Sequence, residues 1–177
     1  MKVPRSLMDE PELVDLALAF PLAELVCAAA ASAPGRTVSS AESCTGGLLA
    51  AVLTAVAGSS GYFLGGVVAY DDSVKVRELR VSQSLLDASG AVSPEVAEAM
   101  AVAVRSRFGS TFGVSTTGVA GPGSSGDRPA GLIYLALAGP DRVAVRRLTG
   151  DRGRHLNRAG AVTAALELLL AGLEVGG

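Results

Sequence analysis

Two side chains in this sequence could act as a nucleophile and its base. Ser43 lies in Glu42–Gly47, where two consecutive glycines would let a substrate approach the backbone amides closely. Lys75 and Lys2 are the only lysines among fifteen basic residues. Arginine keeps its proton in proteins, whereas lysine can lose it when desolvated or placed beside another cation. Lys75 is therefore a candidate general base, and Ser43 a candidate nucleophile.

Each of these residues also has a purely structural interpretation. Lysines on helices usually lie in solvent, and Ser43 or Thr45 could simply cap the helix that follows. Cys44 is a rival nucleophile, but the only histidine, His155, stands far along the chain on a predicted helix. We therefore predict that Cys44 lies in the core, where free cysteines are commonly found.

A glycine-rich segment and an arginine are candidates for binding an anion. Gly121–Gly126 matches the pattern G-x-G-x-x-G, but a predicted strand follows it where a dinucleotide fingerprint requires a helix. The segment is either a loop of free amides that cradles a phosphate or a flexible turn. Arg152, just before the last predicted helix, could bind a phosphate or carboxylate, or pair with Asp151.

Hydrophobic spacing and turn residues predict the elements that position these groups. We expect helices over residues 11–32 (broken at Pro21), 46–57, 73–79, 82–89, 93–108 and 154–173. We expect strands over 36–41, 65–71, 111–117, 131–138 and 142–148, the last two joined as a hairpin. This order predicts an α/β fold, a three-layer α/β/α sandwich around a mixed, mostly parallel sheet of five to six strands.

Ligands of such sheets bind beyond the carboxyl ends of the strands, beside helix N-termini. Three segments of the sequence have that placement, namely 42–47, 70–75 and 117–123. Thr117 ends a predicted strand and could offer a hydroxyl there, although a β-branched residue in a strand needs no further function.

Composition restricts the class of protein. The chain has 177 residues, 49% of them hydrophobic and 18% charged, which favours one globular domain with a frayed start at residues 1–10. A net charge of −2 makes nucleic acid and anionic membranes poor partners. Two cysteines and one histidine favour neither a disulfide framework nor a metal site, and fit a reduced cytoplasm.

Two apolar stretches could be mistaken for membrane or export segments. No charged residue occurs between Glu42 and Asp71, but glycines and serines from Gly58 onward interrupt that run. Acidic residues interrupt the first thirty positions, contrary to a signal peptide. We therefore expect no membrane span and no export signal.

Taken in order, the motifs resemble the CinA C-terminal domain family, over residues 20–172. They are Ala41–Gly47, Ala57–Ser60, Tyr70 with Lys75, Gly90–Ser93, Thr117–Pro122 and Gly150–Arg152. Each motif is weak alone, but the ordered set is specific. The resemblance implies the three-layer fold and a stand-alone nicotinamide-nucleotide amidohydrolase. Such an enzyme converts nicotinamide mononucleotide to nicotinate mononucleotide and ammonia in pyridine-nucleotide salvage, without metal or cofactor.

The resemblance also implies roles for particular residues. Ser43 matches the nucleophile and Lys75 the general base, with Thr117 and Arg152 assisting. Tyr70 would orient Lys75 through its hydroxyl, or only pack. The amides near Gly46 and Gly47 would hold the oxyanion, and the loop Gly121–Gly126 with Arg152 would hold the phosphate. The expected substrate-binding residues are Thr45, Gly46, Gly47, Gly118, Ala120, Gly121 and Gly123.

The sequence departs from the family pattern at two places. Arg128–Gly131 stands where the family usually has Lys-Pro-Val-Gly, and His155–Arg158 replaces a Val-Arg pair. These departures leave a non-catalytic nucleotide-binding module as the alternative; a DNA-related role lacks the basic stripe it would need. Pyrophosphatase activity, associated with a further N-terminal domain of larger members, is not expected. Alanine-rich, apolar terminal helices favour a homodimer.

Overall fold

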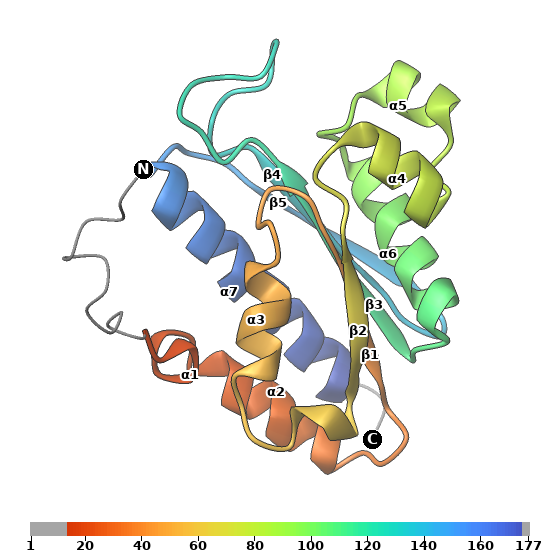
Figure 1. The fold of residues 1–177 in the computed structure, drawn as a ribbon, viewed down its shortest axis with the longest axis vertical. Coiled ribbons are helices and arrows are strands. Elements are labelled where there is room, and N and C mark those ends of the chain that lie inside the picture. The colour runs from red at the N-terminus through yellow and green to blue at the C-terminus, as the bar shows by residue number, and fades with distance from the viewer. Residues whose placement is uncertain (1–13, 175–177) are drawn as a thin grey trace, which may run out of the picture.

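A five-stranded mixed sheet forms the middle layer of the computed structural model, which describes residues 14–174 (Figure 1). The strand order is β2–β1–β3–β4–β5. The strands are β1 (Val38–Glu42), β2 (Phe63–Val68), β3 (Phe112–Gly118), β4 (Ile133–Ala138) and β5 (Val143–Leu148). Strand β1 pairs in parallel with β2 and β3, whereas β4 is antiparallel to both β3 and β5.

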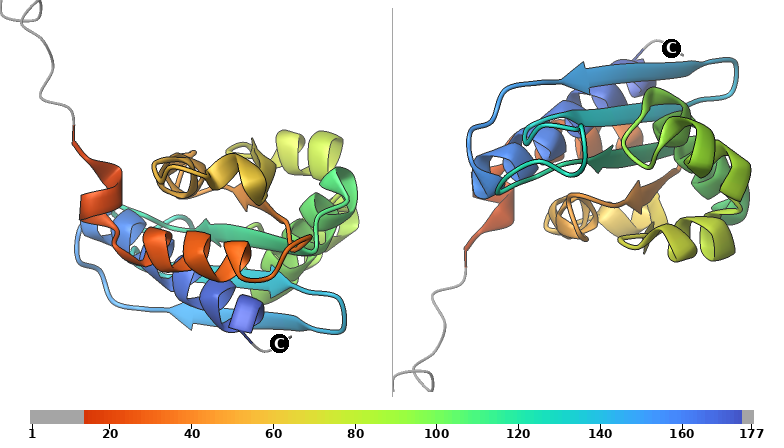
Figure 2. Two further views of the ribbon diagram at one scale, coloured as in Figure 1. Left: turned by 90° about the horizontal axis from the view of Figure 1, so that it is seen from below. Right: turned by 90° about the horizontal axis from the view of Figure 1, so that it is seen from above.

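Helices cover both faces of the sheet (Figure 2). One group consists of α1 (Leu16–Ala19), α2 (Leu22–Ala31), α3 (Leu48–Thr54) and α7 (Arg154–Glu174). The other consists of α4 (Asp72–Leu79), α5 (Gln83–Ser89) and α6 (Pro94–Phe108). A short 3-10 turn, η2 (Ser59–Gly61), precedes β2. The predicted three-layer α/β fold with a mixed sheet is therefore confirmed.

The prediction that most strand pairs are parallel is wrong, because the pairs divide equally between the two directions. Residues 119–132 connect β3 to β4 without a helix. A parallel neighbour needs a crossover connection, usually helical, so a helix-free return leads to antiparallel pairing. Strand β4 consequently begins at the end of the sheet where β1, β2 and β3 finish.

Several predicted boundaries move by a few residues. Helix α3 begins at Leu48 and not at 46, because Gly46 and Gly47 adopt left-handed φ angles of 60° and 92°. Strand β2 runs over 63–68, two residues earlier than expected at its start. Pro21 separates α1 from α2 as predicted. The expected frayed start and residues 11–13 of the first helix lie outside the described residues.

The main core lies between the sheet and the group of α2, α3 and α7. Its largest fully buried apolar side chains include Leu49, Leu53, Leu135, Leu166 and Leu169. In the described part of the chain, α7 is the one helix long and apolar enough to cross a membrane by length and composition. It packs against α2 and β4, and 44% of its apolar window is buried. The apolar side chains of α7 thus form part of the core.

Candidate active site

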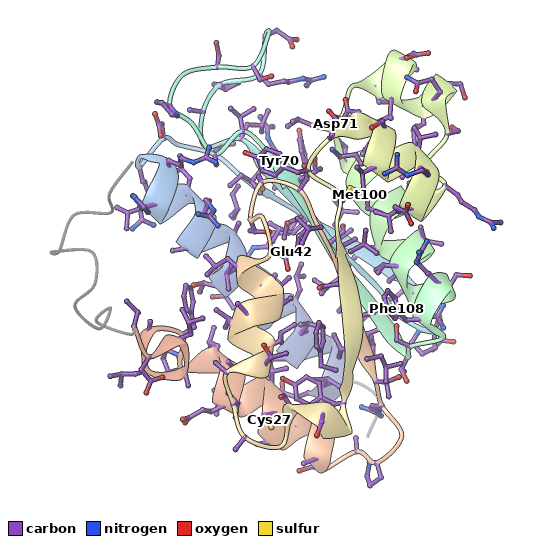
Figure 3. The ribbon with its side chains drawn as sticks, in the orientation of Figure 1. Cys27, Glu42, Tyr70, Asp71, Met100 and Phe108 are labelled. Carbon is purple, nitrogen blue, oxygen red and sulfur yellow. The ribbon has the colours of Figure 1, made fainter. Side chains whose placement is uncertain are left out.

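The turn after β1 is built around a buried carboxylate. Glu42 is fully buried, and its Oε2 accepts hydrogen bonds from Thr45 Oγ1 (2.7 Å) and from the amides of Gly47 and Leu49 (3.0 Å each). Its Oε1 accepts from the amide of Ala50 at 2.8 Å. A carboxylate at a helix N-terminus satisfies amides that lack a partner within the helix and favours the helix dipole. Figure 3 shows Glu42 where β1 meets α3.

This arrangement corrects the predicted oxyanion hole. The Gly47 amide donates to Glu42, and the Gly46 amide donates to the Ser43 carbonyl at 3.1 Å. Both amides are therefore engaged, and the prediction that they are free to hold an oxyanion is wrong. Thr45 is fully buried, and its hydroxyl also lies 2.7 Å from Thr116 Oγ1. Thr45 thus holds the turn together and does not line a cavity.

Six of the predicted site residues line one cavity of about 240 Å³ at the carboxyl ends of β1, β2 and β3. They are Ser43, Tyr70, Lys75, Thr117, Gly118 and Ala120. Ser43 is 8% exposed, and its hydroxyl makes no hydrogen bond to any residue of 14–174. A buried hydroxyl with unused hydrogen-bonding capacity beside a cavity is available to a ligand.

Helix α4 carries Lys75 into this cavity. Asp71 caps the helix by accepting from the side chain and the amide of Ser73, and these bonds lower the pKa of Asp71. Lys75 is only 1% exposed, and its Nζ lies 2.9 Å from Asp72 Oδ1 and 3.4 Å from the Tyr70 carbonyl oxygen.

Asp72 is a partner of Lys75 that the sequence analysis did not assign. The amine is buried as expected, and its contact with the Asp72 carboxylate directs it away from a hydrogen bond with Ser43. Lys75 makes no hydrogen bond to Ser43 among the described residues, although both side chains line the same cavity. Asp72 is thus a site residue that sequence reasoning missed. Its spacing of three from Lys75 on a helix was the available signal.

Arg154 joins the cavity in the place expected for Arg152. Its Nη2 donates to the Tyr70 hydroxyl at 3.1 Å and its Nη1 to the Gly121 carbonyl at 2.8 Å. The Tyr70 hydroxyl therefore contacts Arg154, and the prediction that it orients Lys75 is wrong; only the Tyr70 carbonyl contacts Lys75.

Arg152 lies apart from the cavity. Arg152 lines a separate groove between α7 and the end of β5, and its amide donates to Asn157 Oδ1 at 3.0 Å. Arg152, predicted to assist at the site and to bind the phosphate, is thus not among the residues that line the Ser43 cavity. Arg154 and Arg158 lie one helical turn apart on α7, and both contact loops beside the Ser43 cavity. Arg154 donates to the Gly121 carbonyl and Arg158 to the Thr45 carbonyl. Their spacing of four was the signal in the sequence.

The glycine-rich loop borders a second cavity that extends the first. This cavity measures about 360 Å³ and shares Asp72, Ala91, Val92 and Ser125 with the cavity of Ser43. Arg128 lines it and donates to the Ser89 carbonyl at 3.3 Å. Gly121 contributes its carbonyl to Arg154. Gly123 is exposed and lines neither cavity.

Two further residues complete the walls of the Ser43 cavity. Thr117 is 1% exposed, and its hydroxyl donates to the Ala91 carbonyl at 2.6 Å, which fixes the loop before α6 against the end of β3. Cys44 is buried as predicted, and this burial raises the pKa of its thiol to about 12. The thiol is therefore protonated at neutral pH and a poor nucleophile beside Ser43. Residues 14–174 contain no group of three or more potential metal-ligating His, Cys, Asp or Glu side chains.

Comparison with known proteins identifies the family. The model of the CinA C-terminal domain matches residues 21–173. A CinA-like protein of Frankia casuarinae is 52% identical over 142 residues, which are 77% of this chain and 32% of the relative. A CinA-like protein of Nostoc sp. is 47% identical over 144 residues, covering 72% of this chain and 34% of the relative. The chain thus spans about a third of the length of these curated relatives.

Solved structures match over nearly their whole length. The competence/damage inducible protein CihA from Agrobacterium tumefaciens superposes with a TM-score of 0.80 at 39% identity, covering 85% of this chain and 94% of that one. A CinA superfamily protein from Enterobacter cloacae gives a TM-score of 0.83 at 26% identity, covering 98% and 99%. The fold, the ordered motifs and these matches lead to one conclusion: the chain belongs to the CinA family, through its C-terminal domain.

Proposed function

We propose that this protein is an amidohydrolase that converts nicotinamide mononucleotide to nicotinate mononucleotide and ammonia. The observation that carries the proposal is the shared cavity of Ser43, Lys75 and Thr117, in which the Ser43 hydroxyl has no hydrogen-bonding partner among the described residues. The adjoining cavity supports a nucleotide-sized ligand, because the two together fall within the roughly 300–1,000 Å³ usual for small-molecule sites.

In the proposed reaction the Ser43 oxygen attacks the carboxamide carbon. Lys75 takes the hydroxyl proton as the C–O bond forms, and passes it to the departing nitrogen as the C–N bond breaks, which releases ammonia. Water then hydrolyses the acyl-enzyme ester to the acid. Lys75 can act as the base only when its contact with Asp72 opens, and the Asp72 side chain is 56% exposed and so free to move into solvent.

The phosphate of the substrate requires a cation, and Arg154 is our candidate. Two of its five N–H groups are used by Tyr70 and Gly121, so donors remain for an anion. Arg128 on the wall of the second cavity is a further cation along the same path. We assign no such role to Arg152, because it lines a different groove and not the Ser43 cavity.

The test is ammonia release from nicotinamide mononucleotide by the purified protein. Ser43→Ala should lower kcat by at least roughly a thousandfold, as expected on removing a nucleophile, whereas the adjacent Cys44→Ser should keep most of the activity. Arg154→Ala should raise KM at least about tenfold, while Arg152→Ala, the matched control two residues away, should not. Full activity in Ser43→Ala would refute the mechanism.

A second candidate function is a nucleotide-binding module without catalysis. The contact between Lys75 and Asp72 favours it, because the Lys75 amine is bound to Asp72 at 2.9 Å and makes no hydrogen bond to Ser43 among the described residues. Calorimetry with nicotinamide mononucleotide distinguishes the two functions. Binding that depends on Arg154 but releases no ammonia, in wild type and in Asp72→Asn alike, would favour the module.

We also propose that the protein acts in the cytoplasm on a free nucleotide and without a metal or cofactor. Cys27 and Cys44 are both free thiols, as a reducing compartment allows. Fractionation of the native cells, with detection by antibody, tests the location. Ammonia release that persists after treatment with a chelator tests the independence from metal.

A further inference from the structure

The Ser43 cavity and the cavity that adjoins it meet at an acidic side chain. Four residues line both cavities and are here called the junction, namely Asp72, Ala91, Val92 and Ser125. Helix α4, which begins with Asp72, and the loop of residues 119–132, which carries Ser125, lie at the same end of the sheet (Figure 1). A ligand that extends from the Ser43 cavity into its neighbour therefore passes the Asp72 carboxylate.

The Asp72 carboxylate has hydrogen-bonding capacity left for a ligand. A carboxylate offers about four acceptor sites on its two oxygens. Among residues 14–174, the only donor to this side chain is Lys75, whose Nζ lies 2.9 Å from Oδ1. Oδ2 accepts no hydrogen bond from the described residues, and the side chain is 56% exposed. Asp72 can therefore accept from further donors whether or not its contact with Lys75 persists.

The other junction residues combine an apolar wall with a hydroxyl. Ala91 and Val92 are half-buried, and the Thr117 hydroxyl fixes this wall by donating to the Ala91 carbonyl at 2.6 Å. The backbone of Ser125 is paired with that of Arg128, and the Ser125 hydroxyl makes no hydrogen bond to any described residue. A carboxylate and a free hydroxyl beside an apolar wall match a sugar ring, which offers hydroxyl donors at its edge and C–H groups on its faces.

A metal cation fits the junction less well than a hydroxylated ligand. Asp127 is the second carboxylate of the adjoining cavity, and its Oδ1 lies 3.4 Å from Arg128 Nε. Asp72 contacts Lys75 in the same way. Each carboxylate thus already faces a basic side chain, which a metal cation would have to displace. Hydroxyl donors need displace neither.

We propose that the junction binds the ribose of the substrate, with Asp72 accepting hydrogen bonds from the 2′- and 3′-hydroxyls. This inference rests on the proposed function, because it requires the carboxamide ring to occupy the Ser43 cavity. In nicotinamide mononucleotide the ribose joins that ring to the phosphate. A ring beside Ser43 therefore leaves the ribose where the cavity opens into its neighbour. Asp72 is then the residue that distinguishes a ribonucleotide from a deoxyribonucleotide.

Two nucleotides that differ by one oxygen atom test this assignment. The purified full chain is given nicotinamide mononucleotide or its 2′-deoxy analogue, and kcat/KM is measured for each by ammonia release. Wild type should favour the ribonucleotide at least about tenfold, because hydrogen bonds to a carboxylate are among the stronger ones. Equal kcat/KM values for the two nucleotides in wild type would overturn the assignment.

A matched pair of variants identifies the carboxylate responsible. Asp72→Asn keeps the size of the side chain and one oxygen for Lys75, but an amide nitrogen replaces the other acceptor. This variant should bring the two kcat/KM values to within about threefold of each other. Asp127→Asn makes the same change at the other carboxylate of the adjoining cavity and should keep the wild-type preference. An undiminished preference in Asp72→Asn, or its loss in Asp127→Asn alone, would contradict the role of Asp72.

Calorimetry separates the ribose assignment from the proposed reaction. In Ser43→Ala, which the mechanism makes inactive, the Kd values of the two nucleotides should still differ at least about tenfold, and adding Asp72→Asn should remove the difference. If wild type releases no ammonia but this difference in Kd is present, the amidohydrolase proposal fails and the ribose assignment stands. Ammonia release without any preference for the ribonucleotide gives the reverse result. If neither nucleotide binds, both proposals are wrong.

Discussion

Replacing Glu42 by glutamine tests how the turn that carries Ser43 is held. The carboxylate accepts four hydrogen bonds, three at Oε2 and one, from the Ala50 amide, at Oε1. Glutamine has the same size but only one acceptor oxygen. If that oxygen keeps the three bonds, the side-chain nitrogen faces the Ala50 amide, and two donors are left without an acceptor.

The cost follows from these contacts. Each buried donor left unsatisfied costs about 1–3 kcal/mol, and loss of the negative charge at the start of α3 costs about 0.3–1 kcal/mol more. We expect the free energy of unfolding of Glu42→Gln to fall by roughly 3–5 kcal/mol. Urea denaturation at neutral pH measures this change directly.

The control is the same change at an exposed carboxylate. Glu98 lies on the solvent side of α6, so Glu98→Gln should change the free energy of unfolding by less than about 0.5 kcal/mol. If Glu42→Gln unfolds within 1 kcal/mol of wild type, roughly the size of an ordinary surface effect, the carboxylate does not organise the turn. The reasoning about the start of α3 would then be refuted.

Three further predictions concern a thiol, two glycines and a carboxylate. Burial raises the pKa of Cys44 to about 12, so iodoacetamide should label the half-buried Cys27 first. The reaction is run at pH 8, roughly the pKa of an ordinary thiol, and is measured by mass spectrometry. Preferential labelling of Cys44 would contradict its burial. Gly131→Ala should destabilise by about 2 kcal/mol or more, since φ is +81° and its Cβ would lie 2.4 Å from a backbone oxygen. Gly160→Ala, in open space on α7, should instead stabilise by about 0.5–1 kcal/mol in the same melts. Hydrogen bonds from a backbone amide and an asparagine side chain lower the pKa of Asp151, so its ionised form stabilises the fold above the unfolded-state pKa of about 4, and this is lost as the pH falls. Thermal melts between about pH 5 and pH 3 should therefore decline less steeply for Asp151→Asn than for wild type; equal slopes would contradict the shift.

The local parts of the site could be predicted from the sequence because they depend on neighbouring residues. The helix start at Ser93 follows from its capping side chain, and this cap is present, whereas the helix expected from residue 73 is capped by Asp71. The burial of Cys44 follows from its residue type. The placement of Ser43 and Lys75 at one end of the sheet follows from the order of strands and helices.

The remaining parts depend on distant contacts that a single sequence does not display. Glu42 turns inward because the first amides of α3 have no acceptor within the helix and donate to its carboxylate. These contacts form only when the turn is folded. Arg152 and Arg154 are two residues apart, yet Asn157 ties the amide of Arg152 near a different groove. Side-chain direction at a helix start changes by about 100° per residue, so such neighbours diverge.

The reversed direction of β4 places the candidate active site and the hairpin between β4 and β5 at opposite ends of the sheet. The hairpin at residues 139–142 and the last turn of α7 lie at the end away from Ser43, and α7 alone spans roughly 30 Å from Arg154 to that end. Residues inserted into the hairpin would therefore lie far from the Ser43 cavity, beside a separate cavity of about 400 Å³ lined by Pro140 and Gly172. A domain of this design can be joined to other modules without crowding its own chemistry.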